Sequence, residues 1–260
     1  MSWASRRRSV YLFGVTLFFV IVLGGPLAYW YFSIPPTCSD GTQNQDETGV
    51  DIGGPCPILD PKVLQQETVL WSRSFKVRDG TYSAAAYIEN PNKDAGVEVA
   101  PYHFGLYDQR NVLVAERDGV MFIMPGSITP VLESRIDTGS RIVTHTYLSF
   151  TALLTWRRMQ NVARAVSVED MRLTDTDSIP RLVANAVNTS VADIVDPSFV
   201  AAVFDPAGNA FAVSGTRLER IAAGASARII FSWSEPFGIV PGRTDVIPVV
   251  APTALAPPAQ

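Results

Sequence analysis

A long uncharged apolar run opens the chain. VYLFGVTLFFVIVLGGPLAYWYF occupies residues 10–32 without one charged side chain. A helix needs about 20 apolar residues to cross the hydrocarbon core of a bilayer, so this pattern predicts a transmembrane helix over residues 10–32. Gly24, Gly25 and Pro26 are its weakest helix formers. Glycine and proline are nevertheless tolerated in membrane helices, because leaving backbone groups unpaired in lipid is so unfavourable that the helix remains the best conformation.

Charged and aromatic residues give this predicted helix a direction. Arg6, Arg7 and Arg8 precede it, and the aromatic residues of YWYF end it at 29–32. Arginines favour the cytoplasmic side and aromatic rings favour the interface. We therefore expect residues 1–9 in the cytoplasm, membrane lipid as the partner of residues 10–32, and the rest of this single-pass protein outside the cell membrane. The alternative is a cleaved signal peptide, but the run exceeds the usual ~7–15 apolar residues and no A-x-A-like site follows it.

Beyond residue 66 the pattern changes to short runs of alternating apolar and polar residues, bounded by Gly, Pro, Asn and Asp. Such runs are typical of strands and turns. Alternation places every second residue on one face. The strands are expected at 83–89, 97–107, 112–115, 162–173, 199–204, 211–213 and 227–233, and residues 141–156 are expected to supply a closing strand and the connection to the second unit. The residues expected in the core are Val97, Val99, Phe104, Leu106, Val166, Val168, Met171 and Leu173.

The β-rich part of the sequence is repeated. Asn90, Asp108 and Gly126 recur as Asn188, Asp205 and Gly224, at an offset of about one hundred residues, the size of one small sandwich domain. We therefore predict an all-β fold of two tandem immunoglobulin-like β-sandwiches, over residues 67–158 and 159–248, with a disordered Pro/Ala tail over 249–260.

A polar, glycine-rich segment over residues 33–66 separates the helix from these strands and predicts a stalk. Its two cysteines, Cys38 and Cys56, are the only ones in the chain, and an even count outside the membrane favours one disulfide. Five oxygen-bearing side chains crowd the loop between them, as calcium ligands do, although the spacing is not that of an EF-hand. The alternatives are a calcium site and a stapled, solvated loop without an ion. The candidate ligands are Asp40, Asn44, Asp46, Glu47 and Asp51.

Two short motifs resemble those of known families. The loop is similar to a cysteine-framed motif, C-x-D-G-x-x-N-x-x-E-x-x-x-D-C-G-G-x-C, of bacterial surface proteins, except that Ile52 replaces a further cysteine, which favours a Cys38–Cys56 bridge. Phe104-Gly105-Leu106-Tyr107-Asp108 resembles the signature of the FxLYD domain family, and Val203-Phe204-Asp205 is a degenerate second copy. This resemblance implies immunoglobulin-like modules of the bacterial cell envelope.

Other chemistry has little support in the sequence. A net charge of −4 provides no basic surface for nucleic acid. His103 and His145 lack partners at zinc-ligand spacing, and no nucleotide-binding or hydrolase motif appears. An acidic cluster over 170–177 reads as a solvated strand end rather than a cation site or general base. We therefore expect no enzyme activity and, apart from calcium, no cofactor.

The sequence favours a membrane-anchored extracytoplasmic structural or interaction protein. Its sandwich edges and loops would bind a protein or an envelope polymer. The alternative is an envelope assembly or stress factor that holds exported partners.

Overall fold

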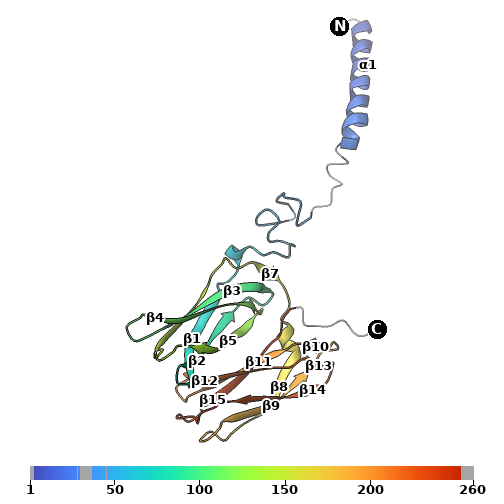
Figure 1. Ribbon diagram of the computed structural model, residues 1–260. Helices are drawn as coiled ribbons and strands as arrows, with labels where there is room; N and C mark the ends of the chain where they lie inside the picture. Colours follow the sequence, from blue (N-terminus) through green and yellow to red (C-terminus); the bar gives the residue numbers. More distant parts are fainter. Residues whose placement is uncertain (1–2, 28, 30–36, 45, 253–260) are drawn as a thin grey trace. The chain divides into compact units, whose positions relative to one another are not determined.

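The computed structural model describes residues 3–27, 29, 37–44 and 46–252. The chain divides into two compact units, residues 1–56 and 57–260. The first unit contains the N-terminal helix and the disulfide loop, and the second contains the β-strands (Figure 1). The protein is therefore mostly β, with one N-terminal apolar helix.

The N-terminal helix consists of α1 (Trp3–Phe19) and a π-helical turn (Val20–Gly24). Pro26 has no N–H to return to the preceding turn, and a widened turn is one way in which a helix absorbs that loss. The segment Val10–Leu27 has a mean hydropathy of 2.2 and none of it is buried. By length and composition it is able to cross a membrane, a property that it shares with a signal sequence. Residues 28 and 30–32 of the predicted span lie outside the described residues.

Two antiparallel sheets face one another in the first half of the second unit, and we call them the first sheet pair. One sheet has the order β1-β2-β5, and the other has the order β4-β3-β6 with β7 beside the start of β3. The 3-10 turn η2 (Pro61–Val63) precedes them. The strands are β1 (Thr68–Arg78), β2 (Thr81–Asn90), β3 (Ala95–Tyr107), β4 (Leu113–Ile123), β5 (Ser127–Asp137), β6 (His145–Phe150) and β7 (Trp156–Arg158).

The second sheet pair follows the turn η3 (Val162–Ala165). One sheet has the order β14-β9-β8, the other has the order β12-β11-β15, and β10 pairs with β13. The strands are β8 (Val166–Thr174), β9 (Arg181–Asn188), β10 (Ile194–Val195), β11 (Ser198–Phe204), β12 (Ala210–Arg217), β13 (Arg220–Ile221), β14 (Ser226–Ser232) and β15 (Arg243–Val249).

The two sheet pairs have equivalent strand orders. β1-β2-β5 corresponds to β8-β9-β14, and β4-β3-β6 corresponds to β12-β11-β15. The turns after β3 and β11 also match. Asp108 N donates to Val112 O at 3.0 Å, and Asp205 N donates to Asn209 O at 2.9 Å. The repeat in the sequence is therefore a repeat of local structure.

Each sheet pair encloses its own core. Phe104 and Leu106 of β3 are fully buried in the first core, together with Ile88 of β2. Leu182 of β9 and Phe231 of β14 are buried in the second. In β3 and β9 the residues that enter the core are two apart, because successive side chains point to opposite faces of a sheet.

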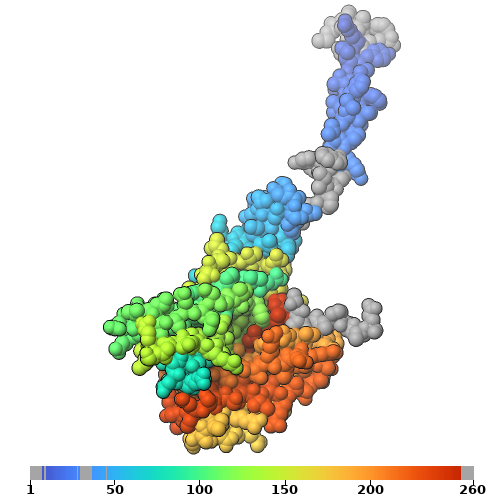
Figure 2. Space-filling view, viewed as in Figure 1, coloured from blue at the N-terminus to red at the C-terminus, as the bar shows by residue number. Residues whose placement is uncertain are grey.

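A third apolar cluster joins the two sheet pairs. It contains Phe75, Ala85 and Tyr87 from the first pair, and Phe204 and Val213 are among its members from the second. The outer face of β1-β2-β5 thus packs on the outer face of β12-β11-β15, and the four sheets form successive layers (Figure 1). In the space-filling view the two pairs meet over a continuous surface (Figure 2).

Several sequence predictions need correction. Val99 and Met171, expected in the cores, are 62% and 50% exposed. The ladder shifts register between Val97 and Ala100, and again beside Asp170, whose φ is +53°. A bulge inserts one residue and turns the next side chain to the other face. The remaining predicted core residues are buried or pack against a core.

The predicted boundaries also differ from the structure. Residues 57–66 belong to the unit that contains the sheets, and Leu59 and Leu64 pack against the first core. At the other end, Val249 completes β15 and Val250 is buried. Residues 253–260 of the predicted tail lie outside the described residues.

Candidate functional site

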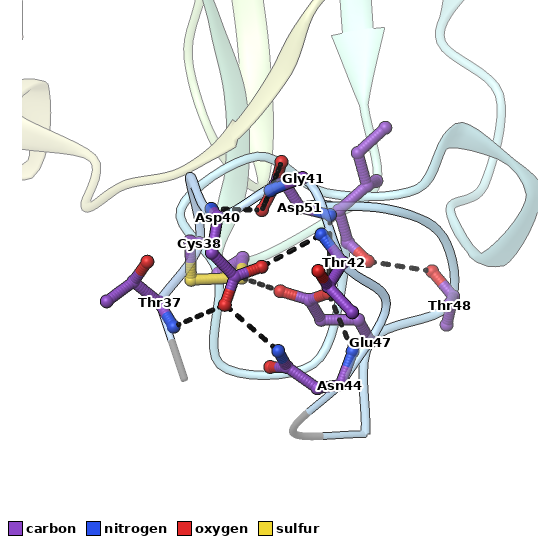
Figure 3. The surroundings of a disulfide bond; sticks show 11 residues. Thr37, Cys38, Asp40, Gly41, Thr42, Asn44, Glu47, Thr48 and Asp51 are labelled. Atoms are coloured by element: carbon purple, nitrogen blue, oxygen red, sulfur yellow. Dashed lines mark hydrogen bonds between the residues drawn. A yellow bond between two sulfur atoms is a disulfide. The ribbon is translucent and has the colours of Figure 1, made fainter. Parts of the chain in front are cut away.

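Cys38 and Cys56 form a disulfide, with their Cα atoms 5.5 Å apart (Figure 3). This agrees with the pairing expected from the sequence. The enclosed loop is too polar to form a core, so the covalent bond and a set of hydrogen bonds hold it instead.

Asp40 holds the start of this loop. Its carboxylate accepts hydrogen bonds from Asn44 Nδ2 at 3.0 Å, from Thr37 N at 3.1 Å and from Thr42 N at 2.8 Å (Figure 3). The bond from the Asn44 side chain, followed by the two backbone bonds, lowers the pKa of Asp40. The ionised carboxylate is favoured because all three groups donate to it.

Glu47 and Asp51 hold the middle of the loop. Asp51 accepts from the backbone N–H groups of Asp40 and Gly41, both at 3.1 Å. Glu47 is only 6% exposed, and its Oε2 accepts from Asn44 N and Asp51 N, both at 3.2 Å. Its Oε1 lies 3.0 Å from Cys56 Sγ. The structure thus gathers these carboxylates around backbone donors.

The five predicted calcium ligands therefore all take part in the structure of the loop. Asp46 turns the chain with a φ of +65°, and the other four take part in the hydrogen bonds above. Cys38, Glu47 and Cys56 also bring possible ligand atoms within 4.8 Å of one another. The sulfurs are oxidised, and the thiolate is the form of cysteine that binds metals, so this group would need reduction before it could act as a soft-metal site.

A row of polar side chains crosses the outer face of β4-β3-β6. His103 Nδ1 lies 2.7 Å from Asp118 Oδ1, and Ser149 is the cross-strand neighbour of His103 on the other side. The row has the residue types of a serine hydrolase triad, which sequence spacing alone did not reveal. β3 is paired on both sides, so its backbone N–H groups point along the sheet and not at a bound carbonyl. β3 therefore offers no backbone N–H group to an oxyanion beside this row.

Two tyrosines stand beside that row. Tyr107 of β3 and Tyr147 of β6 make an edge-to-face contact with ring centroids 5.7 Å apart, and Tyr147 is 58% exposed. The ring of Tyr107 lies so close to Gly105 that a Cβ there would be 2.7 Å from Tyr107 Cε2. The ring of Tyr107 thus covers position 105, and glycine leaves room for it.

The junction between the sheet pairs is built from aromatic rings. Trp71 and Tyr87 lie 4.4 Å apart at their centroids, and Phe204 lies 6.2 Å from Tyr87. The Arg243 guanidinium lies 4.3 Å above the Phe204 ring, a cation–π arrangement. Burial, with a smaller contribution from Asp245, raises the pKa of Tyr87. Arg73 extends the contact by donating to Asn209 Oδ1 at 3.0 Å.

A groove of about 730 Å³ runs along the edge of this junction. Phe211, Trp233 and Phe237 line part of it in successive edge-to-face contacts, each with ring centroids 5.2 Å apart. Trp233 Nε1 donates to Val213 O at 2.9 Å, so its ring is held with its polar atom satisfied. The sequence marked Trp233 as part of a strand, but not as part of a groove.

Comparisons with known proteins place the chain in no family. No family model matches it, and no curated protein matches it. Among solved structures it is similar to red sea bream transglutaminase at 11% identity, over 70% of this chain and 31% of that one, with a TM-score of 0.22. The chain thus spans about a third of the length of that enzyme, and a TM-score this low carries no functional assignment.

Proposed function

We propose that this protein is a membrane-anchored extracytoplasmic interaction protein whose two immunoglobulin-like sandwiches, each resembling an FxLYD module, present binding faces as one rigid body. The observation that carries the proposal is the junction of Trp71, Tyr87, Phe204 and Arg243. An apolar junction of this kind resists hinge motion, whereas flexibly linked domains meet over smaller and more polar contacts.

The N-terminal unit supports the membrane part of the proposal. The segment Val10–Leu27 is long and apolar enough to span a bilayer, and Arg6–Arg8 precede it, which favours an N-terminus inside. The disulfide between Cys38 and Cys56 fits an oxidising compartment outside the cytoplasm.

The orientation is tested by thiol labelling of intact cells. A Cys56→Ser variant leaves Cys38 as a single free thiol, and a membrane-impermeant maleimide is expected to label it before lysis. The matched control is Ser2→Cys in a chain that lacks both native cysteines, which should be labelled only after lysis. Labelling of Cys38 only after lysis would overturn the extracytoplasmic placement.

The interaction part of the proposal is tested by cross-linking in membranes followed by purification of the full chain. One dominant protein or envelope-polymer partner, lost when Tyr147 is changed to Ala, supports the presentation of a binding face. Capture of many unfolded exported proteins supports the alternative of an envelope assembly or stress factor. The groove beside Trp233 favours that alternative, because an exposed aromatic groove suits extended apolar segments, and Trp233→Ala should then reduce the capture.

A further inference from the structure

The internal repeat gives each sheet pair two outer faces of different kinds. We call the outer face of β1-β2-β5, or of its equivalent β8-β9-β14, the A-face. We call the outer face of β4-β3-β6, or of its equivalent β12-β11-β15, the C-face. The junction within the chain packs the A-face of the first pair on the C-face of the second. One face of each kind therefore lies outside the junction: the C-face of the first pair and the A-face of the second.

The free C-face has the same pattern of small and aromatic residues on its central strand as the C-face in the junction. Counting from the matched turns at Asp108 and Asp205, Tyr107 is equivalent to Phe204 and Gly105 to Ala202. Both strands thus carry a small residue two positions before an aromatic ring. The free face differs in charge, because Glu116 stands at the position of Val213, and Asp118 follows it on the same face.

The free A-face carries polar groups where the A-face in the junction carries aromatic rings. Counting from Asn90 and Asn188, Asn185 is equivalent to Tyr87, and through cross-strand pairing Glu169 is equivalent to Trp71. Arg172 is equivalent to Arg73, so an arginine stands at this position in both sheet pairs. Arg181 and Arg228 lie on the same face, as their pairing shows. The free A-face therefore carries three positive charges, from the arginines, and two negative charges, from Glu169 and Asp170. The free C-face of the first pair carries two carboxylates and two histidines: Glu116, Asp118, His103 and His145.

We propose that the free C-face of one chain binds the free A-face of a second copy, so that the junction within the chain is repeated between chains. This deepens the proposed function, on which it rests, by naming the partner of one binding face. Charge complementarity determines how the C-face of one copy lies on the A-face of the next, since an orientation that places like charges in contact is unfavourable. Burying fewer aromatic rings makes the contact weaker than the junction within the chain and more sensitive to salt.

The equivalence assigns individual contacts. Arg73 donates to the carbonyl of Ala210, the first residue of β12, at 3.1 Å. Arg172 of one copy therefore reaches β4 of the next, where the Leu113 carbonyl already accepts from Arg141 at 2.7 Å. Glu116 and Asp118, on the same face of that strand, offer carboxylates whose side chains are 60% and 76% exposed. Arg228, whose strand is equivalent to β5, lies over β6, where Tyr147 offers its ring for a cation–π contact.

The contact joins two different faces, so each chain offers a free face at both ends. Such a heterologous contact does not stop at two copies unless the rotation closes a ring. The expected product in the membrane is a linear or ring-shaped array of stacked sheets.

The test is sedimentation of the full-length chain in detergent, with two charge reversals. The wild-type chain is expected to associate with increasing concentration beyond two copies, and less so at high salt. Glu116→Arg alone and Arg172→Glu alone should each raise the concentration needed for association by about tenfold, because each places like charges in contact. An equimolar mixture of the two variants should regain the wild-type association, since every contact then pairs opposite charges again. Lys62→Glu, an exposed reversal on η2, is the matched control and should change nothing.

Four results would overturn the proposal: a wild-type chain that stays monomeric, association that stops at a dimer, an effect of Glu116→Arg without one of Arg172→Glu, or no recovery in the mixture. Cross-linking of a Tyr107→Cys, Asn185→Cys chain in native membranes gives a second measurement, with both single variants as controls. A negative result in these experiments leaves the thiol labelling of Cys38 and the capture of other partners unaffected, so failure of self-association is distinguishable from failure of the proposed function.

Discussion

Asn90 and Asn188 are the last residues of the equivalent strands β2 and β9, and each uses its side-chain amide to bind carbonyls outside its own sheet. Asn90 Nδ2 donates to the carbonyls of Ala95 and Met124 at 2.7 and 3.0 Å. Asn188 Nδ2 donates to the carbonyls of Ala192 and Ile221 at 2.8 and 3.1 Å. Each asparagine ends the central strand of an A-face sheet; Asn90 ties it to β3 and to the end of β4, and Asn188 ties it to β13 of the two-stranded sheet β10-β13. Both are buried, at 1% and 0% exposure, so each pair is locked at one end by an amide.

Changing Asn188 to Ala should destabilise the protein by about 2–4 kcal/mol. The substitution removes the hydrogen bonds of a fully buried amide to three carbonyls, of which that of Ile221 is buried, and a buried acceptor left unpaired costs about 1–3 kcal/mol. Urea unfolding followed by tryptophan fluorescence measures the effect, and Asn90→Ala should behave alike. Gln109→Ala, in an exposed turn, is the control. An Asn188→Ala chain as stable as that control would show that the amide does not hold β9 to β13 and its flanking loops.

Alkaline pH should reveal the buried hydroxyl of Tyr87. Burial raises the pKa of Tyr87 above its unfolded value of about 10. The contribution of Tyr87 to the free energy of unfolding is therefore fully present below pH ~10. It is lost as the pH rises toward the pKa of Tyr87 in the folded state, because in this range the tyrosine ionises only in the unfolded chain. The free energy of unfolding should fall by about 1.4 kcal/mol per pH unit from this residue alone.

Tyr87→Phe separates this effect from general alkaline unfolding. The Tyr87 hydroxyl is buried without a hydrogen-bond partner in the described part of the chain. Its removal should be neutral or slightly stabilising at pH 7 and should flatten the loss above pH 10. Equal slopes for the wild type and Tyr87→Phe would contradict the burial of this hydroxyl in the folded state.

Gly242 is required by a close approach of two backbones. A Cβ at this position would lie 2.7 Å from Pro206 N and 2.8 Å from Pro206 Cα. Backbone cannot move aside as a flexible side chain can, so Gly242→Ala should cost about 1–3 kcal/mol, as overpacking does. Gly238→Ala meets nothing within 4 Å and is the matched control. Equal unfolding midpoints for the two variants in urea would argue against a close approach at Pro206.

The disulfide loop should hold its structure without calcium. The carboxylates of Asp40, Glu47 and Asp51 accept backbone N–H bonds, so we expect no heat and no thermal shift when Ca²⁺ is titrated into the full chain. Cys56→Ser should open the loop to proteolysis, because closing a loop of this size contributes about 3 kcal/mol in the chain-entropy model. Binding heat that disappears in Asp51→Asn would instead assign calcium to the loop.

Local chemistry made several features predictable. Phe104 and Leu106 are two apart in a strand and so share its buried face, as expected. Aspartate favours turns because its carboxylate accepts backbone bonds there, and Asp108 Oδ1 accepts from Arg110 N at 2.9 Å and Val112 N at 3.0 Å. The disulfide followed from the number of cysteines and their position outside the predicted helix.

Features that depend on distant residues were not predictable in this way. Met171 matches the apolar pattern of its strand, yet a bulge at Asp170 turns it outward, and a bulge depends on the partner strand. The strands β5 and β15 were not anticipated, since Pro130 and Pro248 weaken the local strand signal. Proline remains compatible with an edge strand because one side of such a strand needs no donor.

The apolar helix, the disulfide and the repeated strand periods follow from local sequence, because they depend on residues close together in the chain. The contact of Tyr87 with Phe204 arises in the folded protein, and with it the choice of which sheet faces are covered and which stay free. Alternation shows that a strand has two faces but does not say what packs on each, since that choice depends on the burial of aromatic surface between segments more than one hundred residues apart.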